Sequence, residues 1–249
     1  MFDTLSWSNP WAIALIINTA LIILAFVSPK KLLTPFGIVN GAALGVLVWG
    51  TLGWRGYLIV MLFFLLGSGL TFVGIEQKEA EGIAEERSGM RGAGNVWGSA
   101  LTASICAIAT LFCPPSYRDL FVLGYVASFC TKLSDTTASE VGKAYGKTTY
   151  LITNLKPVPR GTEGAVSLEG TLAGAFASVV LAAIAWLIGL ISPVGIIWCV
   201  VAAFIATTIE SLIGATLESR FTWLTNDLVN LINTTIGAIA AMFFAGITI

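Results

Sequence analysis

The sequence predicts an all-α, polytopic integral membrane protein, a helix bundle of about eight transmembrane helices. Of its 249 residues, 56% are hydrophobic and only 11% are charged, and the mean hydropathy is +0.88. Apolar runs long enough to cross a hydrocarbon core of about 30 Å recur along the chain between short charged segments. Lys and Arg residues concentrate in alternate connecting segments. We therefore expect residues 1–249 to form one integral membrane domain.

The apolar runs define eight predicted spans, of which the fifth is the weakest because it includes Lys132, Ser134 and Asp135. It is retained because, without it, the basic segments after the third and fifth spans would fall on opposite sides of the membrane. No cleavable signal peptide is expected, because the residues before the first apolar run include Asp3 but no basic residue. The predicted spans are residues 11–27, 36–52, 57–73, 96–112, 120–138, 171–191, 194–214 and 228–247.

The charge distribution predicts the orientation. Arg55 and Arg118 are the only basic residues outside the segments that follow spans one, three, five and seven. Because basic segments remain on the cytosolic side, we expect both termini to lie on the non-cytosolic side. The eleven basic residues assigned to the cytosolic side, out of thirteen, are Lys30, Lys31, Lys78, Arg87, Arg91, Lys132, Lys143, Lys147, Lys156, Arg160 and Arg220.

The composition excludes several kinds of chemistry. The chain has no His, which excludes His-based catalytic triads, the usual zinc sites and His-ligated haem. Its four Cys residues show no paired spacing and are interpreted as small buried apolar residues. A net charge of −1 gives no reason to expect nucleic acid binding. Any reaction must therefore use carboxylates, amines, guanidinium groups, amides and hydroxyls.

We divide the domain into scaffold helices, residues 1–73, and a catalytic part, residues 74–249, with cytosolic loops 74–94 and 132–170. Gly41 and Gly45 in the scaffold have the spacing of close helix packing. The charges of residues 76–91 are interpreted mainly as a solvated face on a helical extension of the third span. Arg91 is the better functional candidate there, because it adjoins three glycines and precedes Asn95 at the membrane edge.

The segment after the fifth span is polar and rich in glycine. On a helical continuation of that span, Asp135 and Ser139 share a face, and Thr136, Glu140 and Lys143 line a neighbouring one. An ionisable residue such as Asp135 at membrane depth is costly without a role. The two carboxylates are therefore interpreted as functional, against the alternative of an ordinary cytosolic loop of mixed charge.

Phosphate chemistry needs cationic side chains and backbone N–H donors, and Mg²⁺ needs one or two carboxylates. Residues 156–161 include two prolines, which make a stiff loop able to hold Arg160 over a site, and Gly161 permits close backbone approach. Residues 142–148 resemble a Walker A loop. However, only three residues separate the two glycines and no buried strand precedes them, so a P-loop fold is not expected.

A polar stripe marks the start of the last span, where Asn226, Asn230, Asn233 and Thr234 recur at helical spacing. Hydrogen bonding between helices or the lining of a site would each explain such a stripe. We favour the lining of a site, because Asp227 adds a carboxylate to the amides.

Four motifs together resemble a known family. They are SDTTASEVGKAYGK, VPRGTEGAVSLEGTLAG, ESLIGATLES and NDLVNLINTTIGA. Their order and spacing resemble those of the membrane family that includes phytyl-phosphate kinase of tocopherol biosynthesis. The resemblance extends from about Thr71 onward. The motif containing Asp135 is also similar to motifs of dolichol and phytol kinases and of membrane cytidylyltransferases.

The resemblance implies transfer of a phosphoryl group from a nucleoside triphosphate, such as CTP, to phytyl or prenyl monophosphate, in a bacterial inner membrane of cyanobacterial type or a plastid membrane. Mg²⁺ is the implied cofactor. The partners are the isoprenoid monophosphate lipid, the nucleotide and membrane lipids, but not nucleic acid, and no oligomeric state is predicted. Alternatives are a CTP-dependent cytidylyltransferase, a polyprenol kinase, and a transporter or flippase, whose polar sites usually lie near the bilayer midplane.

Under this hypothesis the site residues have three roles. The catalytic residues are Asp135, Glu140 and Asp227. The Mg²⁺ ligands are Asp135, Glu140 and Glu210. The residues that bind nucleotide or phosphate are Arg91, Asn95, Thr136, Ser139, Gly142, Lys143, Lys147, Arg160, Gly161, Glu163, Asn226, Asn230 and Asn233.

Overall fold

The helices follow the predicted apolar runs in the computed structural model, which describes residues 9–85, 89–218 and 220–248. Asp3 and Arg87, used above for the N-terminus and the charge distribution, lie outside the described residues. Side chains accept N–H hydrogen bonds at the starts of most of the long helices, for example Thr34 and Thr225, which fixes where the helices begin. The long helices are α1 (Pro10–Val27), α2 (Pro35–Thr71), α4 (Ala93–Phe112), α5 (Arg118–Tyr145), α6 (Leu168–Leu187), α7 (Pro193–Ile213) and α8 (Asn226–Gly246).

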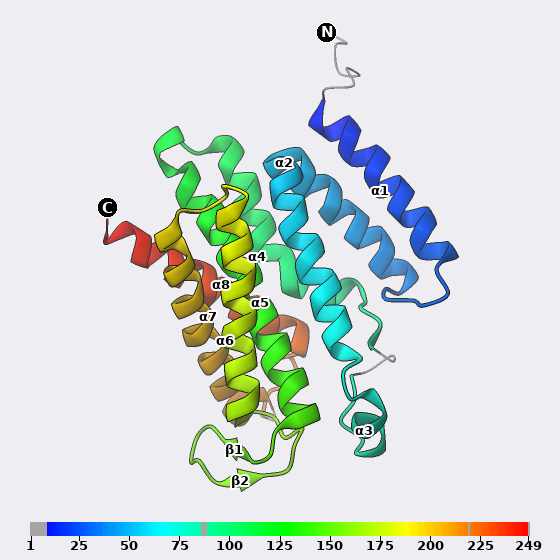
Figure 1. Cartoon of the computed structure of the whole chain (residues 1–249), viewed down its shortest axis with the longest axis vertical. Helices are drawn as coiled ribbons and strands as arrows, with labels where there is room; N and C mark the ends of the chain where they lie inside the picture. Colours follow the sequence, from blue (N-terminus) through cyan, green and yellow to red (C-terminus); the bar gives the residue numbers. More distant parts are fainter. Residues whose placement is uncertain (1–8, 86–88, 219, 249) are drawn as a thin grey trace.

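Helix α2 contains two of the predicted spans. Gly53, with φ 66° and ψ −160°, interrupts it between the second and third predicted spans, and this left-handed region favours glycine. The two halves run in opposite directions (Figure 1). Six helices of the described chain are long and apolar enough to cross a membrane, with α2 counted once and the more polar α5 not included. Counting both halves of α2 and α5 agrees with about eight crossing segments.

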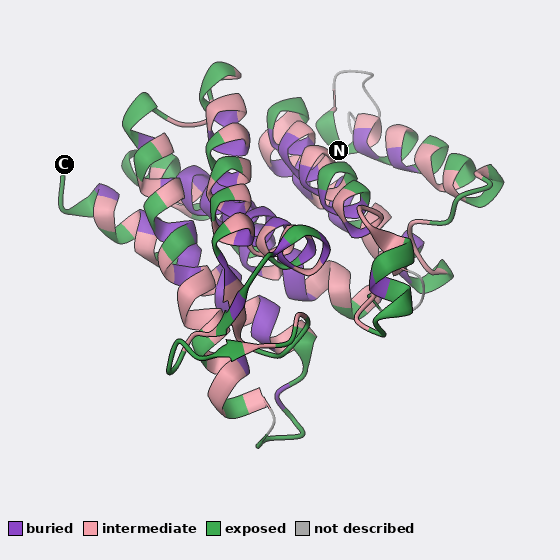
Figure 2. Cartoon of the chain, turned by 60° about the horizontal axis from the view of Figure 1, so that its bottom comes forward, coloured by how far each residue is buried: buried purple, intermediate pink, exposed green. Residues whose placement is uncertain are grey.

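Helix α5 is the central helix, although it is the least apolar of the long helices. It packs against α2, α4, α6, α7 and α8. Tyr125 and Phe129 of α5 are fully buried and contact each other edge to face. Buried residues concentrate where the helices meet, and outward faces are more exposed (Figure 2). Because lipid cannot satisfy polar groups, the helix with the most polar residues is stable only when other helices surround it.

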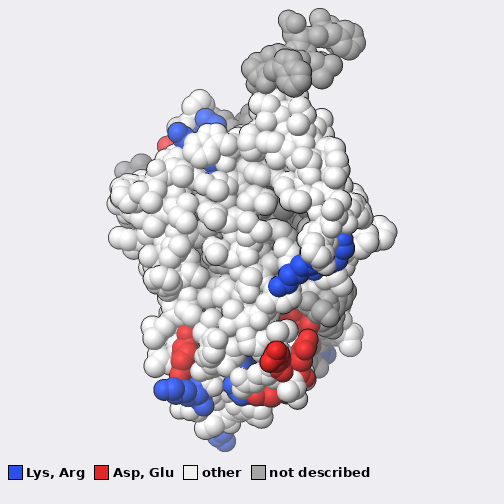
Figure 3. Space-filling model, turned by 45° about the vertical axis from the view of Figure 1, so that its right-hand side comes forward, with Lys and Arg blue, Asp and Glu red and all other residues white. Residues whose placement is uncertain are grey.

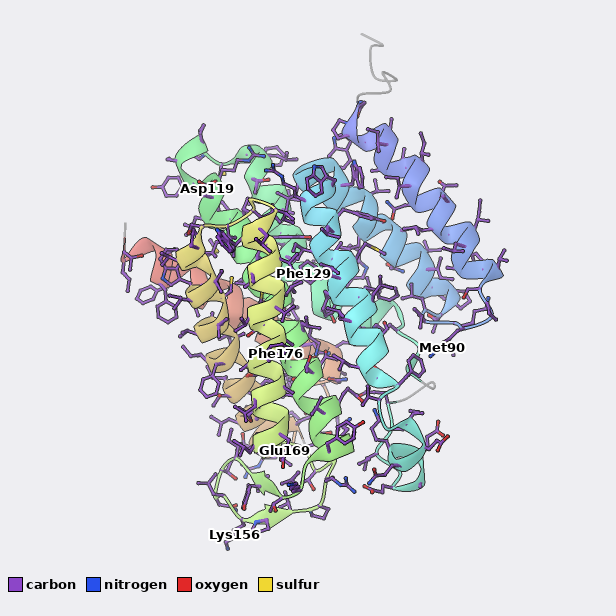
Figure 4. The ribbon with its side chains drawn as sticks, viewed as in Figure 1. Met90, Asp119, Phe129, Lys156, Glu169 and Phe176 are labelled. Atoms are coloured by element: carbon purple, nitrogen blue, oxygen red, sulfur yellow. The ribbon has the colours of Figure 1, made fainter. Side chains whose placement is uncertain are left out.

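The connecting segments predicted to share one side do meet at one end of the bundle. The backbone N–H of Arg91 donates to the carbonyl of Leu32 (3.0 Å), and Arg160 forms an ion pair with Glu81 (2.5 Å). Asp119 and Lys156 lie at opposite ends (Figure 4), and charged side chains flank a largely uncharged middle on the face in Figure 3. The grouping of the basic segments is confirmed among the described residues. That this end faces the cytosol stays a prediction.

Two local expectations were incomplete or wrong. The segment after α2 is not a helical extension, because α2 ends at Thr71 and Gly74, with φ 62°, begins a separate short helix, α3 (Ile75–Ala80). The loop after α5 contains a small antiparallel sheet in the order β2-β1-β3. Its strands are β1 (Thr149–Leu151), β2 (Pro157–Val158) and β3 (Ala165–Ser167). Elsewhere, the π-helical segment η3 (Gly214–Glu218) extends α7.

Candidate functional site

Five polar side chains from α5, α7 and α8 meet inside the bundle, and we call them the central cluster. The ammonium group of Lys132 donates to Asp135 (2.5 Å) and to the amide oxygen of Asn230 (2.5 Å). The amide of Asn233 donates to Glu210. The carboxyl groups of Asp135 and Glu210 are themselves within hydrogen-bonding distance. Three helices therefore converge on one group of charges.

The local sequence explains this convergence. Lys132 and Asp135 are three residues apart on α5, so one helical face carries both. Helix α8 approaches α5 closely at Gly237, where a Cβ atom would lie 2.0 Å from the hydroxyl oxygen of Thr131. Asp135 lies about 25 Å along α5 from its start, beyond the middle of a 30 Å hydrocarbon core. The central cluster thus lies in the half of the bundle that ends at the basic segments.

A second contact joins the starts of α4 and α8. The amide of Asn95 donates to a carboxylate oxygen of Asp227 (3.1 Å), and its own oxygen accepts from the backbone N–H of Gly92 (3.0 Å). Two glycines allow this approach, since a Cβ atom at Gly94 would lie 1.9 Å from the Asp227 carboxylate and one at Gly98 would lie 2.6 Å from its carbonyl oxygen. The predicted site residues Asn95 and Asp227 are therefore direct partners.

An outer cluster joins the segment after α2 to the end of α5, and it consists of Lys78, Glu85, Glu140 and Lys143. Lys78 is fully buried, is paired with Glu140, and also donates to the carbonyl of Thr71 (2.8 Å). Lys143 pairs with Glu85 (3.2 Å). Although burial raises the pKa of Glu85, the Lys143 ammonium lowers it further, and the net result is a pKa below the ordinary value. Interpreting residues 76–91 mainly as a solvated face is therefore wrong for the buried Lys78, whereas Glu76, Glu79, Glu81 and Glu85 are exposed.

Arg91 lies between the outer cluster and α2. Its guanidinium group is 5.2 Å from the centre of the Phe63 ring and lies against Gly67, where a Cβ atom would be 2.6 Å from one of its nitrogens. Burial lowers the pKa of Arg91 to about 10, while the Glu85 and Glu140 carboxylates raise it. Arg91 thus remains a cation at neutral pH. In the described part of the chain, no carboxylate lies within ion-pair distance of it.

The loop after α5 forms an open pocket of about 420 Å³. Lys147 and Arg160 both line it, and the Arg160 guanidinium is oriented by Glu81 and by the carbonyl of Ala144 (3.5 Å). The remaining lining residues are Gly146, Thr148, Thr149, Pro157 and Val158. Two cations of this loop that were predicted to bind phosphate therefore line one pocket, and that role stays a prediction.

In the described chain, the other predicted site residues form no ion pair with these groups, although the Glu163 carboxylate interacts electrostatically with Lys143. Gly142 is buried within α5, where a Cβ atom would lie 3.1 Å from the hydroxyl of Ser167, so it serves helix packing and no Walker A loop is formed. Thr136 is partly buried. Ser139, Gly161, Glu163 and Asn226 are exposed.

The polar stripe of α8 serves hydrogen bonding between helices at three of its four positions. Asn230 binds Lys132, Asn233 binds Glu210, and Thr234 binds Thr102 (3.2 Å). Lining of a site is compatible with the same contacts, because the amide oxygen of Asn233 is buried and has no hydrogen-bond partner in the described chain.

The predicted carboxylate pair is divided between the two clusters. Asp135 contacts Lys132 and Glu210, whereas Glu140 contacts Lys78. Across residues 9–85, 89–218 and 220–248, no group of three acidic or thiol side chains is arranged to hold a metal. Asp135 with Glu210 and the free Asn233 oxygen nevertheless supply the hard oxygen donors that Mg²⁺ takes, together with substrate phosphates. Contacting carboxyl groups also repel when both are ionised, so a cation would stabilise them.

Sequence reasoning missed Lys132 and Lys78 as members of these clusters. Lys132 could have been identified, because a Lys inside a predicted span and three residues from Asp135 requires a buried partner. Nothing in the local pattern distinguishes Lys78 from its exposed neighbours Glu76 and Glu79, since its burial depends on packing against α5.

These observations define a polytopic membrane protein in which polar residues from several helices converge near one end of the bundle. The chain belongs to the family described as integral membrane protein DUF92, whose family model matches residues 18–238. This confirms the membrane family that the four motifs predicted.

Three relatives show how far the similarity extends. The chain is 60% identical to an uncharacterized membrane protein of Synechocystis sp., over 95% of this chain and 92% of that protein. It is 45% identical to Protein VTE6, chloroplastic, of Arabidopsis thaliana, over 95% of this chain and 72% of that protein. It is 30% identical to a membrane protein of Methanocaldococcus jannaschii, over 82% of each. No solved structure matches the chain significantly.

Proposed function

We propose that this protein is a kinase that transfers the terminal phosphoryl group of a nucleoside triphosphate to an isoprenoid monophosphate, phytyl or prenyl, and releases the isoprenoid diphosphate. The observation that carries the proposal is the convergence of Lys132, Asp135 and Glu210 near the end of the bundle where further cations gather. The same reaction is supported by membership of the family that the four motifs predicted, since that resemblance is to a family that includes phytyl-phosphate kinase.

The substrates place two demands on the site. An isoprenoid chain must stay in lipid, while the nucleotide arrives from water, so the reaction must occur where the helices reach the interface. The position of the central cluster, beyond the midplane, suits that demand. The same position argues against a transporter, whose site usually lies at the midplane on broken helices.

The reaction depends more on positive charge that stabilises the phosphate groups than on a strong general base. An oxygen of the lipid phosphate attacks the γ-phosphorus, a new P–O bond forms, and the bond between γ-phosphorus and the bridging oxygen breaks to release the nucleoside diphosphate. Because the attacking phosphate is already an anion, no His is required. Lys147 and Arg160 line one open pocket and would bind nucleotide phosphates there. Asp135, Glu210 and Asn233 would hold Mg²⁺, which neutralises developing phosphate charge when bound.

The test uses purified protein in detergent with CTP, ATP, GTP or UTP, labelled in separate reactions at the α- or γ-phosphorus. The acceptors are phytyl and geranylgeranyl monophosphate, and lipid products are separated by chromatography. We expect γ-label in a lipid diphosphate with at least one nucleotide. Transfer of α-label would instead identify a cytidylyltransferase type of reaction, and absence of label from every lipid product would reject both enzyme hypotheses.

A further inference from the structure

The helices interpreted as scaffold enclose an apolar pocket of about 270 Å³. It lies between α1, both halves of α2 and the start of α4, and apolar side chains such as Leu21, Leu44, Val60 and Phe64 form most of its wall. The pocket follows α2 from Tyr57 to Leu65, which is about 12 Å of helix axis. A pocket of this shape suits an extended hydrocarbon chain.

The two ends of the pocket differ in polarity. At one end lie Lys30, Arg91 and Asn95. At the other end Tyr57 donates to the buried Asn18 (3.1 Å), which lies against Gly45, where a Cβ atom would be 2.1 Å from the Asn18 side-chain oxygen. The pocket is therefore cationic where it meets the basic segments and closed by a packed polar contact deeper in the bundle.

The cationic end suits a phosphate group. Among the described residues Arg91 has no ion-pair partner, although it is largely enclosed by Phe63 and Gly67. A cation so enclosed is stabilised by an anion, and guanidinium groups bind phosphate in a bidentate manner. Asn95 lines the same end and binds Asp227, so this end adjoins the site of the proposed reaction.

We propose that this pocket binds the isoprenoid chain of the lipid substrate, with its phosphate at Arg91, and that the contact between Tyr57 and Asn18 limits how much chain is bound. The inference deepens the proposed function and rests on it. A pocket of this volume takes one chain, so the occupant is a single-chain isoprenyl monophosphate and not a bilayer phospholipid with two acyl chains.

Gly41 provides a sharp test. It lines the pocket, and a Cβ atom there would meet only Leu33, at 3.8 Å, so Gly41→Phe fills the pocket without a clash at the backbone. Gly69 lies in the same helix outside the pocket lining and has nothing within 4 Å of an added Cβ atom, so Gly69→Phe is the matched control. Binding of geranyl, farnesyl and geranylgeranyl monophosphate is measured from the shift in thermal unfolding of each protein in detergent.

In the wild type and in Gly69→Phe, we expect affinity to rise with chain length until the chain reaches Tyr57 and then to level off. Gly41→Phe should lose at least tenfold in affinity for geranylgeranyl monophosphate but less for geranyl monophosphate. Arg91→Gln should weaken binding of geranylgeranyl monophosphate but not of geranylgeraniol, which lacks the phosphate. An unchanged chain-length profile in Gly41→Phe, or equal stabilisation by phosphatidic acid, would overturn the inference.

The assay separates this inference from the proposed function. Binding that depends on chain length and on Gly41, in a protein that transfers no phosphoryl group, would support the pocket and reject the kinase. Transfer by the wild type with an unchanged chain-length profile in Gly41→Phe would support the kinase and reject the pocket.

Discussion

Lys78 of α3 and Glu140 of α5, 62 residues apart in the sequence, form an ion pair in which both side chains are almost completely buried. The pair ties the segment after α2 to the end of the central helix. It also holds Glu140 at Lys78, and in the described chain Glu140, Asp135 and Glu210 are not arranged to hold one metal ion together.

Removing one member of this pair should destabilise the protein strongly. Lys78→Met and Glu140→Gln each leave the other group buried without its partner, which costs about 3–5 kcal/mol for a buried charge. The double variant should regain much of that loss, since it leaves neither charge. Unfolding of all four proteins in detergent measures the coupling. Additive losses would show that the two residues do not interact.

The same variants test the predicted metal role of Glu140. If Lys78→Met with Glu140→Gln keeps phosphoryl transfer near the wild-type rate, Glu140 is a structural residue only. Loss of transfer in a double variant of normal stability would retain the metal role.

Asp135→Asn should lower the transfer rate by at least a hundredfold without preventing folding. Lys132 can still donate to the amide oxygen and keeps the nearby Glu210 carboxylate, but the amide lacks the charge that a metal requires. Glu210→Gln should have a smaller effect in the same direction. Asp119→Asn is the matched control, since Asp119 begins the same helix at the opposite end of the bundle (Figure 4). Rates are measured at saturating lipid and nucleotide, and full activity in Asp135→Asn would remove Asp135 from the site.

Gly94→Ala should separate Asn95 from Asp227. The added Cβ atom would lie 1.9 Å from the Asp227 carboxylate, so this flexible side chain must rotate away and lose its hydrogen bond. We expect a loss of about 1 kcal/mol or less in stability, as for one hydrogen bond, together with at least a tenfold loss of transfer. Gly69→Ala adds the same atom within a helix where nothing lies within 4 Å, so it should leave the transfer rate unchanged and raise stability slightly. A normal transfer rate in Gly94→Ala would show that the position of Asp227 is unimportant.

The orientation can be tested directly. A reporter active only outside the cytosol, such as alkaline phosphatase, should be active when fused after α8 and inactive when inserted at residues 153–155, in the loop between β1 and β2. This expectation follows from the basic residues that gather at the end with the small sheet. The opposite pattern would place the central cluster near the non-cytosolic surface.

Local patterns predicted much of the fold. The apolar runs located the long helices to within a few residues at most ends, because hydrocarbon thickness and the need to satisfy the backbone dictate their length. The distribution of basic residues among the connecting segments predicted that α5 crosses the membrane, although the mean hydropathy of this helix is low. Asp227 and Asn95, both predicted as site residues, are hydrogen-bonded partners, while their roles stay a prediction.

Other features depended on packing between distant segments. The burial of Lys78, the division of Asp135 and Glu140 between two clusters, and the pocket beside α1 arise from how helices meet. The spacing of apolar residues within one helix does not specify which segment, 60 or more residues away in the sequence, packs against it. The assignment of residues 1–73 to a scaffold remains a prediction, and the pocket gives those helices a role that their composition did not indicate.

The central cluster has a consequence for the biogenesis of the protein. Lys132 and Asp135 leave the ribosome well before Asn230, Asn233 and Glu210, so α5 must enter the membrane while most of its polar partners are still unsynthesised. Charged residues within a lone membrane-spanning helix oppose insertion. Stable integration of α5 therefore depends on the arrival of the last two helices, and a chain arrested before α8 should expose α5 to the quality-control proteases of the membrane.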